Sequence, residues 1–300
     1  MILITGATGT VGVKLTGELL AGGVPFRALV RDPRRATRML GPDVDFVEGD
    51  YERPETLRAA LAGIDRLFLI SPLTPRLADQ EGNVIDAAVR AGMEHVVKLS
   101  TLGVLKYTDG HSSSEPRQYP LHRLSEERLE RSGMAFTHLR AGPFMQNVFA
   151  FAPQIASEGA FYGSWGHGHM GYVDVRDVAA VAARVLTEDG HERKAYGITG
   201  PEALSQAQVA EKLSAATGKA VRYVDVPPEA AREGMLGRGM PEWLVGAMVE
   251  VMASIRKGDA NETCDGVCRV TGMTPRSFDE FAREFAPALE PSLAEATGSA

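Results

Sequence analysis

The first 140 residues alternate between short β-branched, apolar runs and longer stretches with helical spacing. In the helical stretches apolar residues recur every three or four positions, as at Val11, Leu15 and Leu19, which would line one helix face. Alternation of this kind predicts a parallel sheet covered by helices on both faces. Six strands are expected, at Ile2–Thr5, Phe26–Val30, Asp45–Glu48, Arg66–Ile70, His95–Ser100 and Thr137–Arg140.

The pattern changes after residue 140. Residues 141–175 are rich in glycine and aromatic residues and show little periodicity. Beyond them the spacing predicts helices over 175–186, 205–217 and 241–257, short strands over 195–198 and 221–226, and a last helix opened by Thr274-Pro275. The helix from 205 begins with a capping box, Ser205 to Gln208.

The predicted fold class is therefore α/β. We expect a Rossmann-type doubly wound parallel sheet in residues 1–140, which would bind a dinucleotide. Residues 141–300 are expected to form a smaller α+β substrate-binding portion, not strictly contiguous, with strands free to return to the first sheet. Residues 102–118 predict a long loop beside the site, and the chain after about Glu290 is small and polar.

Composition narrows the class of protein further. The chain has 300 residues, 44% hydrophobic and 24% charged, and a formal net charge of −7, which argues against nucleic acid and acidic membranes as partners. No apolar run approaches the roughly 20 residues of a membrane span, and no signal peptide is recognised, so a cytoplasmic location is expected. Two cysteines form no disulfide framework, and neither they nor His167-x-His169 have the further ligands that a metal needs, so no metal is expected.

A glycine motif lies directly between the first predicted strand and the first predicted helix. In such a motif the first glycine permits the turn, the second allows the backbone to approach a pyrophosphate, and the third allows the helix to pack against the strand. The alternative is a plain glycine-rich turn, but the flanking elements favour dinucleotide binding. The expected phosphate-binding residues are Gly6, Thr8, Gly9, Thr10, Val11 and Gly12.

The end of the second strand predicts which dinucleotide is bound. An NAD site places an acid about 20 residues after the glycines, where it binds the ribose 2′-hydroxyl. Arg31 occupies that place, with Arg34 and Arg35 close by, and a guanidinium suits a 2′-phosphate. We therefore expect NADP(H), with NAD(H) as the alternative that Asp32 leaves open.

Several segments together resemble one family, the NmrA-like atypical short-chain dehydrogenase/reductases, and within it the branch of type 2 NAD(P)H:quinone oxidoreductases and triphenylmethane reductases. The resemblance runs from Ile2 to about Phe285. It implies an active site in a cleft between two domains, Asp50 and Tyr51 beside the adenine, and Ser71 and Ser100 along the cofactor groove. It is carried by Gly6–Gly12, Val30-Arg31-Asp32-Pro33, Glu48-Gly49-Asp50-Tyr51, Leu139-Arg140-x-Gly142-Pro143-Phe144-x-x-Asn147 and Val173-Asp174-Val175-Arg176-Asp177-Val178-Ala179.

The Tyr-x-x-x-Lys motif of ordinary short-chain reductases is missing. Tyr119 and Arg123 imitate it, whereas His122 and Glu126 match the His-x-x-x-Glu that the resemblance implies here. Residues four apart share a helix face, so Glu126 is placed to orient or charge His122. The alternative is a surface histidine in an ordinary helix salt bridge. We take His122 and Glu126 as candidate catalytic residues, with Asn147 added by the resemblance.

Two classes of function remain open from the sequence. Phe144, Met145, Trp165 and Tyr172 are candidates for an aromatic-rich substrate pocket, although a plain hydrophobic core would also use them. The first function is NADPH-dependent hydride transfer to a quinone, enone or related conjugated molecule. Such an acceptor delocalises negative charge, so the transfer needs little help from an acid. The protein is expected to be a monomer or homodimer. The second is a non-catalytic NAD(P)-sensing regulator, and a weaker third is an isomerase or cyclisation enzyme.

Overall fold

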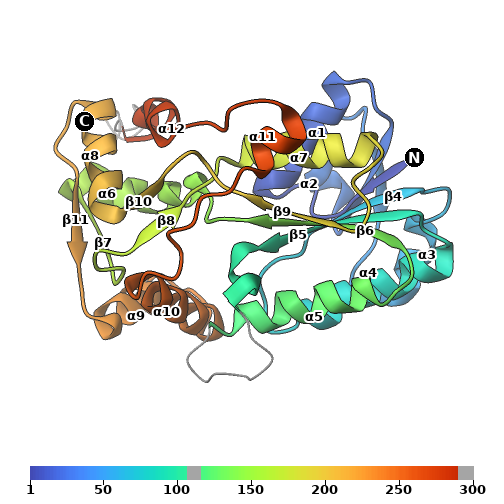
Figure 1. Cartoon of the computed structure of the whole chain (residues 1–300), viewed down its shortest axis with the longest axis horizontal. Coiled ribbons are helices and arrows are strands. Elements are labelled where there is room, and N and C mark those ends of the chain that lie inside the picture. The colour runs from blue at the N-terminus through green and yellow to red at the C-terminus, as the bar shows by residue number, and fades with distance from the viewer. Residues whose placement is uncertain (107–115, 290–300) are drawn as a thin grey trace, which may run out of the picture. The chain divides into compact units, whose positions relative to one another are not determined.

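The structure, a computed structural model, describes residues 1–106 and 116–289 and divides into two compact units (Figure 1). The middle of the loop expected over 102–118 and the polar tail after Glu290 lie outside the described residues. The first unit comprises Met1–Gly142, Val175–Ile198 and Asp265–Thr274. The second comprises Pro143–Asp174, Thr199–Cys264 and the described part of Pro275–Ala300.

The first unit is built on a seven-stranded sheet in the order β3-β2-β1-β4-β5-β6-β9, in which every neighbouring pair is parallel. This confirms the expected Rossmann-type sheet, and all six predicted strands form within two residues of their predicted ends. The strands are β1 (Ile2–Ile4), β2 (Phe26–Val30), β3 (Asp45–Glu48), β4 (Arg66–Leu69), β5 (His95–Thr101), β6 (Ala135–Ala141) and β9 (Lys194–Ile198).

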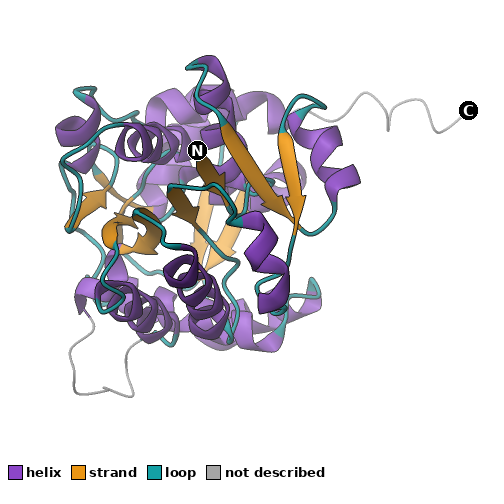
Figure 2. Cartoon of the chain, turned by 90° about the vertical axis from the view of Figure 1, so that its right-hand side faces the viewer, coloured by secondary structure: helices purple, strands orange, loops and turns teal. Residues whose placement is uncertain are grey.

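Helices cover both faces of this sheet (Figures 1 and 2). Helices α1 (Thr10–Ala21), α7 (Val175–Thr187) and α11 (Gly266–Thr271) pack together on one face, above the sheet in Figure 1. The other face carries α3 (Pro54–Ala60), α4 (Leu77–Ala91) and α5 (Gln118–Glu130). The short helix α2 (Pro33–Leu40) follows β2, and the 3-10 helix η1 (Leu102–Lys106) follows β5. Apolar residues are therefore needed on both faces of the sheet, which explains its strand sequences.

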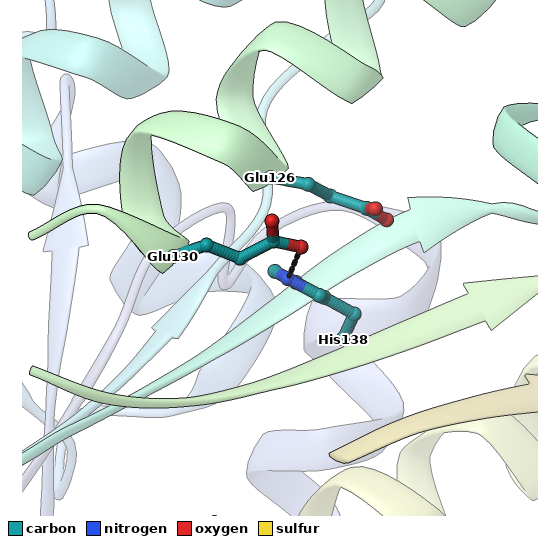
Figure 3. Close-up of side chains that lie close together, drawn as sticks. All are labelled: Glu126, Glu130 and His138. Carbon is teal, nitrogen blue, oxygen red and sulfur yellow. Dashed lines mark hydrogen bonds and ion pairs between the residues drawn. The ribbon is translucent and has the colours of Figure 1, made fainter. Parts of the chain in front are cut away.

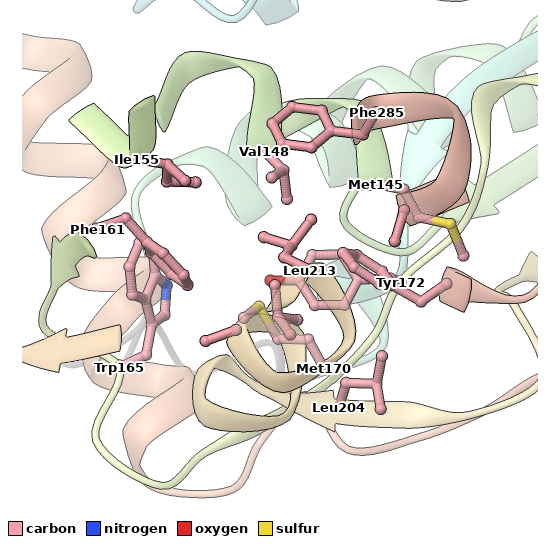
Figure 4. Packing of buried hydrophobic residues seen from close by; sticks show 14 of the residues in the cluster. Met145, Val148, Ile155, Phe161, Trp165, Met170, Tyr172, Leu204, Leu213 and Phe285 are labelled. Carbon is pink, nitrogen blue, oxygen red and sulfur yellow. The ribbon is translucent and has the colours of Figure 1, made fainter. Parts of the chain in front are cut away.

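The second unit has two small sheets, an antiparallel pair of β8 (His169–Gly171) with β10 (Ala203–Ser205) and a parallel pair of β7 (Ala160–Gly163) with β11 (Arg222–Asp225). Its core gathers aromatic and aliphatic side chains, including Phe161, Trp165 and Phe285 (Figure 4). In the part of the chain that the structure describes, no helix has the length and hydropathy to cross a membrane. The helices of the second unit are η2 (Met145–Phe151), α6 (Ala152–Glu158), α8 (Gln206–Thr217), α9 (Pro228–Gly237), α10 (Glu242–Arg256), α12 (Phe278–Phe285) and η3 (Ala286–Leu289).

Two helix starts test the capping predictions. The capping box at α8 is confirmed, because the Ser205 side chain accepts from the Gln208 backbone and the Gln208 side chain accepts from the Ser205 backbone. The start predicted at Thr274-Pro275 is wrong, since α12 begins at Phe278 with Ser277 as its N-cap. Ser277 and Glu280 satisfy two N–H groups reciprocally, whereas a proline at the first turn satisfies none.

Candidate functional site

The glycine loop after β1 lies where the strand order of the sheet reverses. The chain runs from β1 outward to β2 and β3 and then returns to place β4 on the other side of β1. The Thr5 Oγ1 donates to the Phe68 carbonyl oxygen at 2.9 Å and accepts from the Ile70 N–H at 2.9 Å, which ties the ends of β1 and β4 together. Ligands of open α/β sheets bind at such a reversal, outside the carboxyl ends of the strands.

Each glycine of the loop is required for a different reason. Gly6 has φ +59°, and a Cβ there would lie 2.6 Å from the Ile70 Cγ2. A Cβ on Gly12 would lie 2.2 Å from the Gly6 carbonyl oxygen, so only glycine lets α1 approach the loop this closely. Gly9 is exposed and is the N-cap of α1, where no side chain caps the helix. The N–H groups of the first helical turn are thus left for an external anion, and the loop fits a dinucleotide pyrophosphate.

The other residues expected in this cradle differ in exposure. Thr8 is half-buried and Thr10 exposed, so both side chains are within reach of a ligand. Val11 is 1% exposed and packs into the core below the loop. Its contribution to anion binding is therefore limited to its backbone N–H.

Replacing Gly9 by valine should abolish NADPH binding while the chain stays folded. A Cβ at Gly9 meets only the Gly6 carbonyl oxygen, at 3.1 Å, so a shift of a few tenths of an ångström accommodates it, but it occupies the space through which a pyrophosphate approaches. NADPH titration and thermal unfolding would measure the two effects. Gly17→Val is the matched control, because Gly17 lies in the same helix with nothing within 4 Å of its Cβ position. Unchanged NADPH affinity in Gly9→Val would remove the cradle interpretation.

The end of β2 favours Arg31 over Asp32 as the ribose-binding residue. Both side chains are exposed, but the Asp32 Oδ1 accepts a hydrogen bond from the Arg35 N–H at 3.0 Å and so caps α2. An aspartate engaged as an N-cap loses stabilising capping when it turns to another ligand. Arg31 has no such duty, and Arg34 and Arg35 are exposed on the first turn of α2.

Two further residues expected near the adenine also have structural partners. The Asp50 Oδ1 accepts from the Glu52 N–H at 2.9 Å. The Tyr51 hydroxyl donates to the Ile70 carbonyl oxygen at 2.9 Å, and burial raises the pKa of this phenol well above its usual value. Tyr51 therefore stabilises the end of β4 beside the glycine loop, and its contact with adenine stays a prediction.

The sheet face beneath α4 and α5 becomes polar toward the carboxyl ends of the strands. The strand register places Leu67, Val96 and Phe136 in one row across β4, β5 and β6, and all three are apolar. Two residues further along each strand, the row reads Leu69, Lys98 and His138, and the row after it holds Ser100 and Arg140 on β5 and β6. The polar rows lie at the same end of the sheet as the glycine loop, where a cofactor would bind.

Glu126 is bound to arginine and not to His122. Its carboxylate is completely buried and accepts from Arg140 Nη2 at 2.6 Å and Nε at 3.1 Å, while Arg123 Nη1 lies 3.4 Å away. Burial opposes ionisation, but the Arg140 guanidinium outweighs it and holds the pKa of Glu126 below its usual range. Glu126 therefore acts on His122 through its charge alone.

Glu126 also belongs to a cluster with the spacing of metal ligands. Glu130 lies near it and binds the His138 Nε2 at 3.2 Å (Figure 3). However, Arg123 lies 3.4 Å from both carboxylates, and Arg140 already pairs with Glu126. These guanidinium groups supply the positive charge that a metal would otherwise bring, so we interpret the cluster as an ion-pair network.

His122 is a half-buried, neutral imidazole whose Nδ1 is buried. It lies on α5, and its Nδ1 has no hydrogen-bond partner among the described residues. Burial and the nearby charge of Lys98 lower the pKa of His122 to about 4, against a smaller opposing effect of Glu81 and Glu126. At neutral pH this histidine can orient a substrate by hydrogen bonding, but it carries no proton to release as an imidazolium.

The neutral state of His122 predicts a loss of stability in mild acid. Below about pH 6.5 the unfolded chain protonates this histidine, whereas the folded chain stays neutral down to about pH 4. The unfolded state thus binds more protons, and the free energy of unfolding should fall by about 2 kcal/mol between pH 7 and pH 5 through this group. Urea unfolding of the wild type and His122→Gln at both pH values would measure it. Equal pH dependence in the two proteins would contradict this assignment.

The sequence analysis missed the pair that neighbours His122. Lys98 on β5 and Glu81 on α4 are both almost completely buried, and the Lys98 Nζ lies 2.7 Å from the Glu81 Oε2. The available signal was a single lysine within the otherwise uncharged segment Val96–Ser100 of a strand expected to be buried.

Tyr119 and Arg123, which imitate the missing Tyr-x-x-x-Lys motif, are engaged in packing and ion pairs. Tyr119 is 8% exposed, and its ring packs so closely on Gly103 that a Cβ there would lie 2.0 Å from it. Arg123 binds Glu127 at 3.1 Å, besides its two longer contacts with glutamates. Arg123 therefore serves the ion-pair network rather than the lysine role of the missing motif.

The pocket candidates of the second unit are mostly core residues. Met145, Trp165 and Tyr172 are 1%, 8% and 5% exposed and belong to one hydrophobic cluster (Figure 4). Phe144 is half-buried and Asn147 is exposed. Of these five, Phe144 and Asn147 have the most side-chain surface to offer a substrate. The pocket role of the first four and the catalytic role of Asn147 stay predictions.

Comparisons with known proteins cover almost the whole chain. The model of the NmrA-like family matches residues 1–282. The chain is 40% identical to an NAD(P)H azoreductase of Xenophilus azovorans, over 96% of this chain and 99% of that protein. It is also similar to the crystal structure of an NADPH-dependent quinone oxidoreductase from Escherichia coli complexed with NADPH, with a TM-score of 0.84, 30% identity and coverage of 95% and 99%. The crystal structure of a Citrobacter triphenylmethane reductase complexed with NADP(H) is similar too. Its TM-score is 0.82 and its sequence identity 27%, over 95% of this chain and 99% of that chain.

Proposed function

The chain belongs to the NmrA-like family, and we propose that it is an NADPH-dependent oxidoreductase that transfers hydride to a conjugated small molecule. The observation that carries this proposal is the uncapped glycine loop at the sheet reversal, followed by Arg31 at the end of β2. The relatives that match over almost their full length support it, since they are named as reductases of azo compounds, quinones and triphenylmethane dyes.

Some residues of this chain would bind the cofactor, and His122 would orient the substrate. NADPH, when bound, would supply the hydride, while the first turn of α1 would hold its pyrophosphate and Arg31 its 2′-phosphate. His122, being neutral, would orient the substrate rather than protonate it. Acceptors such as a quinone, an enone or an azo compound delocalise the charge that hydride brings, and the accompanying proton is taken from water. Among the described residues, neither His122 nor Glu126 serves as a strong acid, which favours this substrate class.

The test is oxidation of NADPH, followed at its nicotinamide absorbance, against a panel of quinones, enones, azo dyes and cationic triphenylmethane dyes. We expect turnover with at least one acceptor class and none without an acceptor. Gly9→Val, which should not bind the cofactor, is the control for a non-enzymatic reaction. Absence of turnover with every acceptor would overturn the proposed activity.

A regulator that senses the redox state of NADP(H) is the second candidate. It is favoured by one observation, that the Tyr-x-x-x-Lys motif is replaced by a buried Tyr119 and an Arg123 engaged with glutamates. Such a regulator would bind NADPH and NADP⁺ with different affinities and capture a protein partner in one state only. That result together with an inactive acceptor panel would favour the regulator.

For the enzyme we propose a cytoplasmic monomer or homodimer that needs only its cofactor and a small-molecule substrate.

A further inference from the structure

Three elements of the first unit bring a buried chain of polar groups together. Lys98 on β5 and Glu81 on α4 form an ion pair at 2.7 Å, with side chains 0% and 1% exposed. The Ser71 Oγ, just beyond β4, donates to the other carboxylate oxygen, Glu81 Oε1, at 2.9 Å. The Lys98 Nζ also lies 3.3 Å from the Leu99 carbonyl oxygen. These linked polar groups thus extend from the middle of β5 to the carboxyl end of β4.

Stability alone does not account for this pair. Removing two charges from water costs several kcal/mol per ion, and well-packed apolar residues in place of a buried ion pair are often neutral or stabilising. Apolar residues border one side of the pair, since Leu69, the register neighbour of Lys98 on β4, and Val84 and Ile85 on α4 all belong to one hydrophobic cluster. The charges therefore point to a role in placing another group.

Ser71 is the group that the pair places. A serine hydroxyl has one proton and two lone pairs. Glu81 is ionised, because the Lys98 ammonium outweighs the effect of burial and lowers the pKa of its carboxyl. An ionised carboxylate only accepts, so the proton of Ser71 must point inward to Glu81. The lone pairs of Ser71 are then left for a partner on its other side, and the side chain is only half-buried.

The position of Ser71 indicates what that partner is. Ser71 follows Ile70, whose side chain lies against Gly6 and whose carbonyl accepts from Tyr51. Ser71 is therefore at the sheet reversal, next to the glycine loop that fits a dinucleotide. A hydroxyl that offers only lone pairs binds a donor, which on a dinucleotide is a ribose hydroxyl or the carboxamide NH₂, and it does not bind a phosphate oxygen.

We propose that Glu81 and Lys98 are positioning residues for the dinucleotide, which hold the Ser71 hydroxyl as a hydrogen-bond acceptor toward a ribose hydroxyl or carboxamide donor of the cofactor. This inference rests on the cofactor of the proposed function. Two other groups on α5, His122 and Ser125, lie near the pair, and both favour the ionised form of the Glu81 carboxyl. Neither replaces Ser71, because the hydrogen bond at 2.9 Å reaches Glu81 from Ser71.

The test is a cycle of variants with the NADPH Kd as readout, measured by titration calorimetry. Ser71→Ala should weaken NADPH binding by about three- to tenfold, the value of one neutral hydrogen bond, and Ser71→Thr should retain affinity. Glu81→Leu with Lys98→Met removes both charges and the acceptor for Ser71, and should cause a similar loss. Glu81→Gln with Lys98→Met removes the charges, and the amide can present either its oxygen or its NH₂ to Ser71, so this variant should lose NADPH affinity, but less than Glu81→Leu with Lys98→Met.

The decisive measurement is additivity. If the pair acts through Ser71, adding Ser71→Ala to Glu81→Leu/Lys98→Met should cause no further loss of NADPH affinity. Thermal unfolding of each variant shows that it is folded. Should the double variants not fold, the contrast between Ser71→Ala and Ser71→Thr still decides whether Ser71 binds the cofactor. Fully additive losses, or a Ser71→Ala protein with wild-type affinity, would overturn the proposal.

The outcome is separable from that of the proposed function. A wild type that binds NADPH but reduces no acceptor would overturn the reductase activity, while the cycle of Kd values would still support or overturn the role of the pair. Conversely, turnover with unchanged Kd values across the cycle would leave the reductase intact and remove the pair from cofactor binding.

Discussion

Replacing His122 by alanine is expected to lower kcat/KM on the best acceptor by about 10- to 1,000-fold, with the NADPH Kd nearly unchanged. The side chain lies on α5, and burial lowers its pKa to about 4, so the wild-type group is an uncharged hydrogen-bonding imidazole. A loss near the lower end would fit an orienting role with a delocalised acceptor. Steady-state kinetics and NADPH titration of the same preparation would measure both quantities.

The pH dependence sharpens this first prediction. His122 is protonated only as the pH falls toward about 4. The pH profile of kcat/KM should therefore be the same near pH 6.5 in the wild type and in His122→Gln. His95→Ala is the matched control, since burial also lowers the pKa of His95 to about 4 while its ring bonds Thr137 at the amino end of β5. That variant should lose stability but keep kcat. An equal loss of kcat/KM in both variants would indicate a general packing effect and contradict the role of His122.

Replacing Arg31 by aspartate is expected to weaken NADPH binding by about 10- to 100-fold and to narrow or reverse the preference over NADH. A charge-assisted contact to the 2′-phosphate contributes about 1–3 kcal/mol, and an aspartate would repel that phosphate while accepting from the 2′-hydroxyl of NADH. Arg31 is exposed at the end of β2, so the substitution should leave the fold intact. Titration with both dinucleotides gives the ratio of the two Kd values.

The control for Arg31 is Arg38→Asp, which makes the same change of charge in the last turn of α2. It should alter the NADPH preference much less, because a screened charge about a helix length away has little effect. Equal wild-type affinity for NADPH and NADH, or equal effects of the two substitutions, would show that Arg31 does not read the 2′-phosphate.

The sequence by itself determined the first sheet and its glycine loop. The strands of a sheet that is covered on both faces need mostly apolar residues, and short β-branched, apolar runs placed β1 to β6 within two residues. The loop could be predicted because its requirements are local: a turn at Gly6, an open N-cap at Gly9 and close packing at Gly12 each depend on a few neighbouring residues. Arg31 was found by its distance along the chain from these glycines.

Tertiary structure alone decided which polar side chains meet. His122 and Glu126 share a helix face, yet Glu126 is bound by Arg140 of β6, and His122 neighbours Glu81 and Lys98 instead. Helical spacing describes contacts within one helix, whereas these partners come from two strands and a helix that the sheet topology brings together. A buried charge takes the partner that best compensates its lost hydration, and that partner is set by the register of neighbouring strands, which no local pattern encodes.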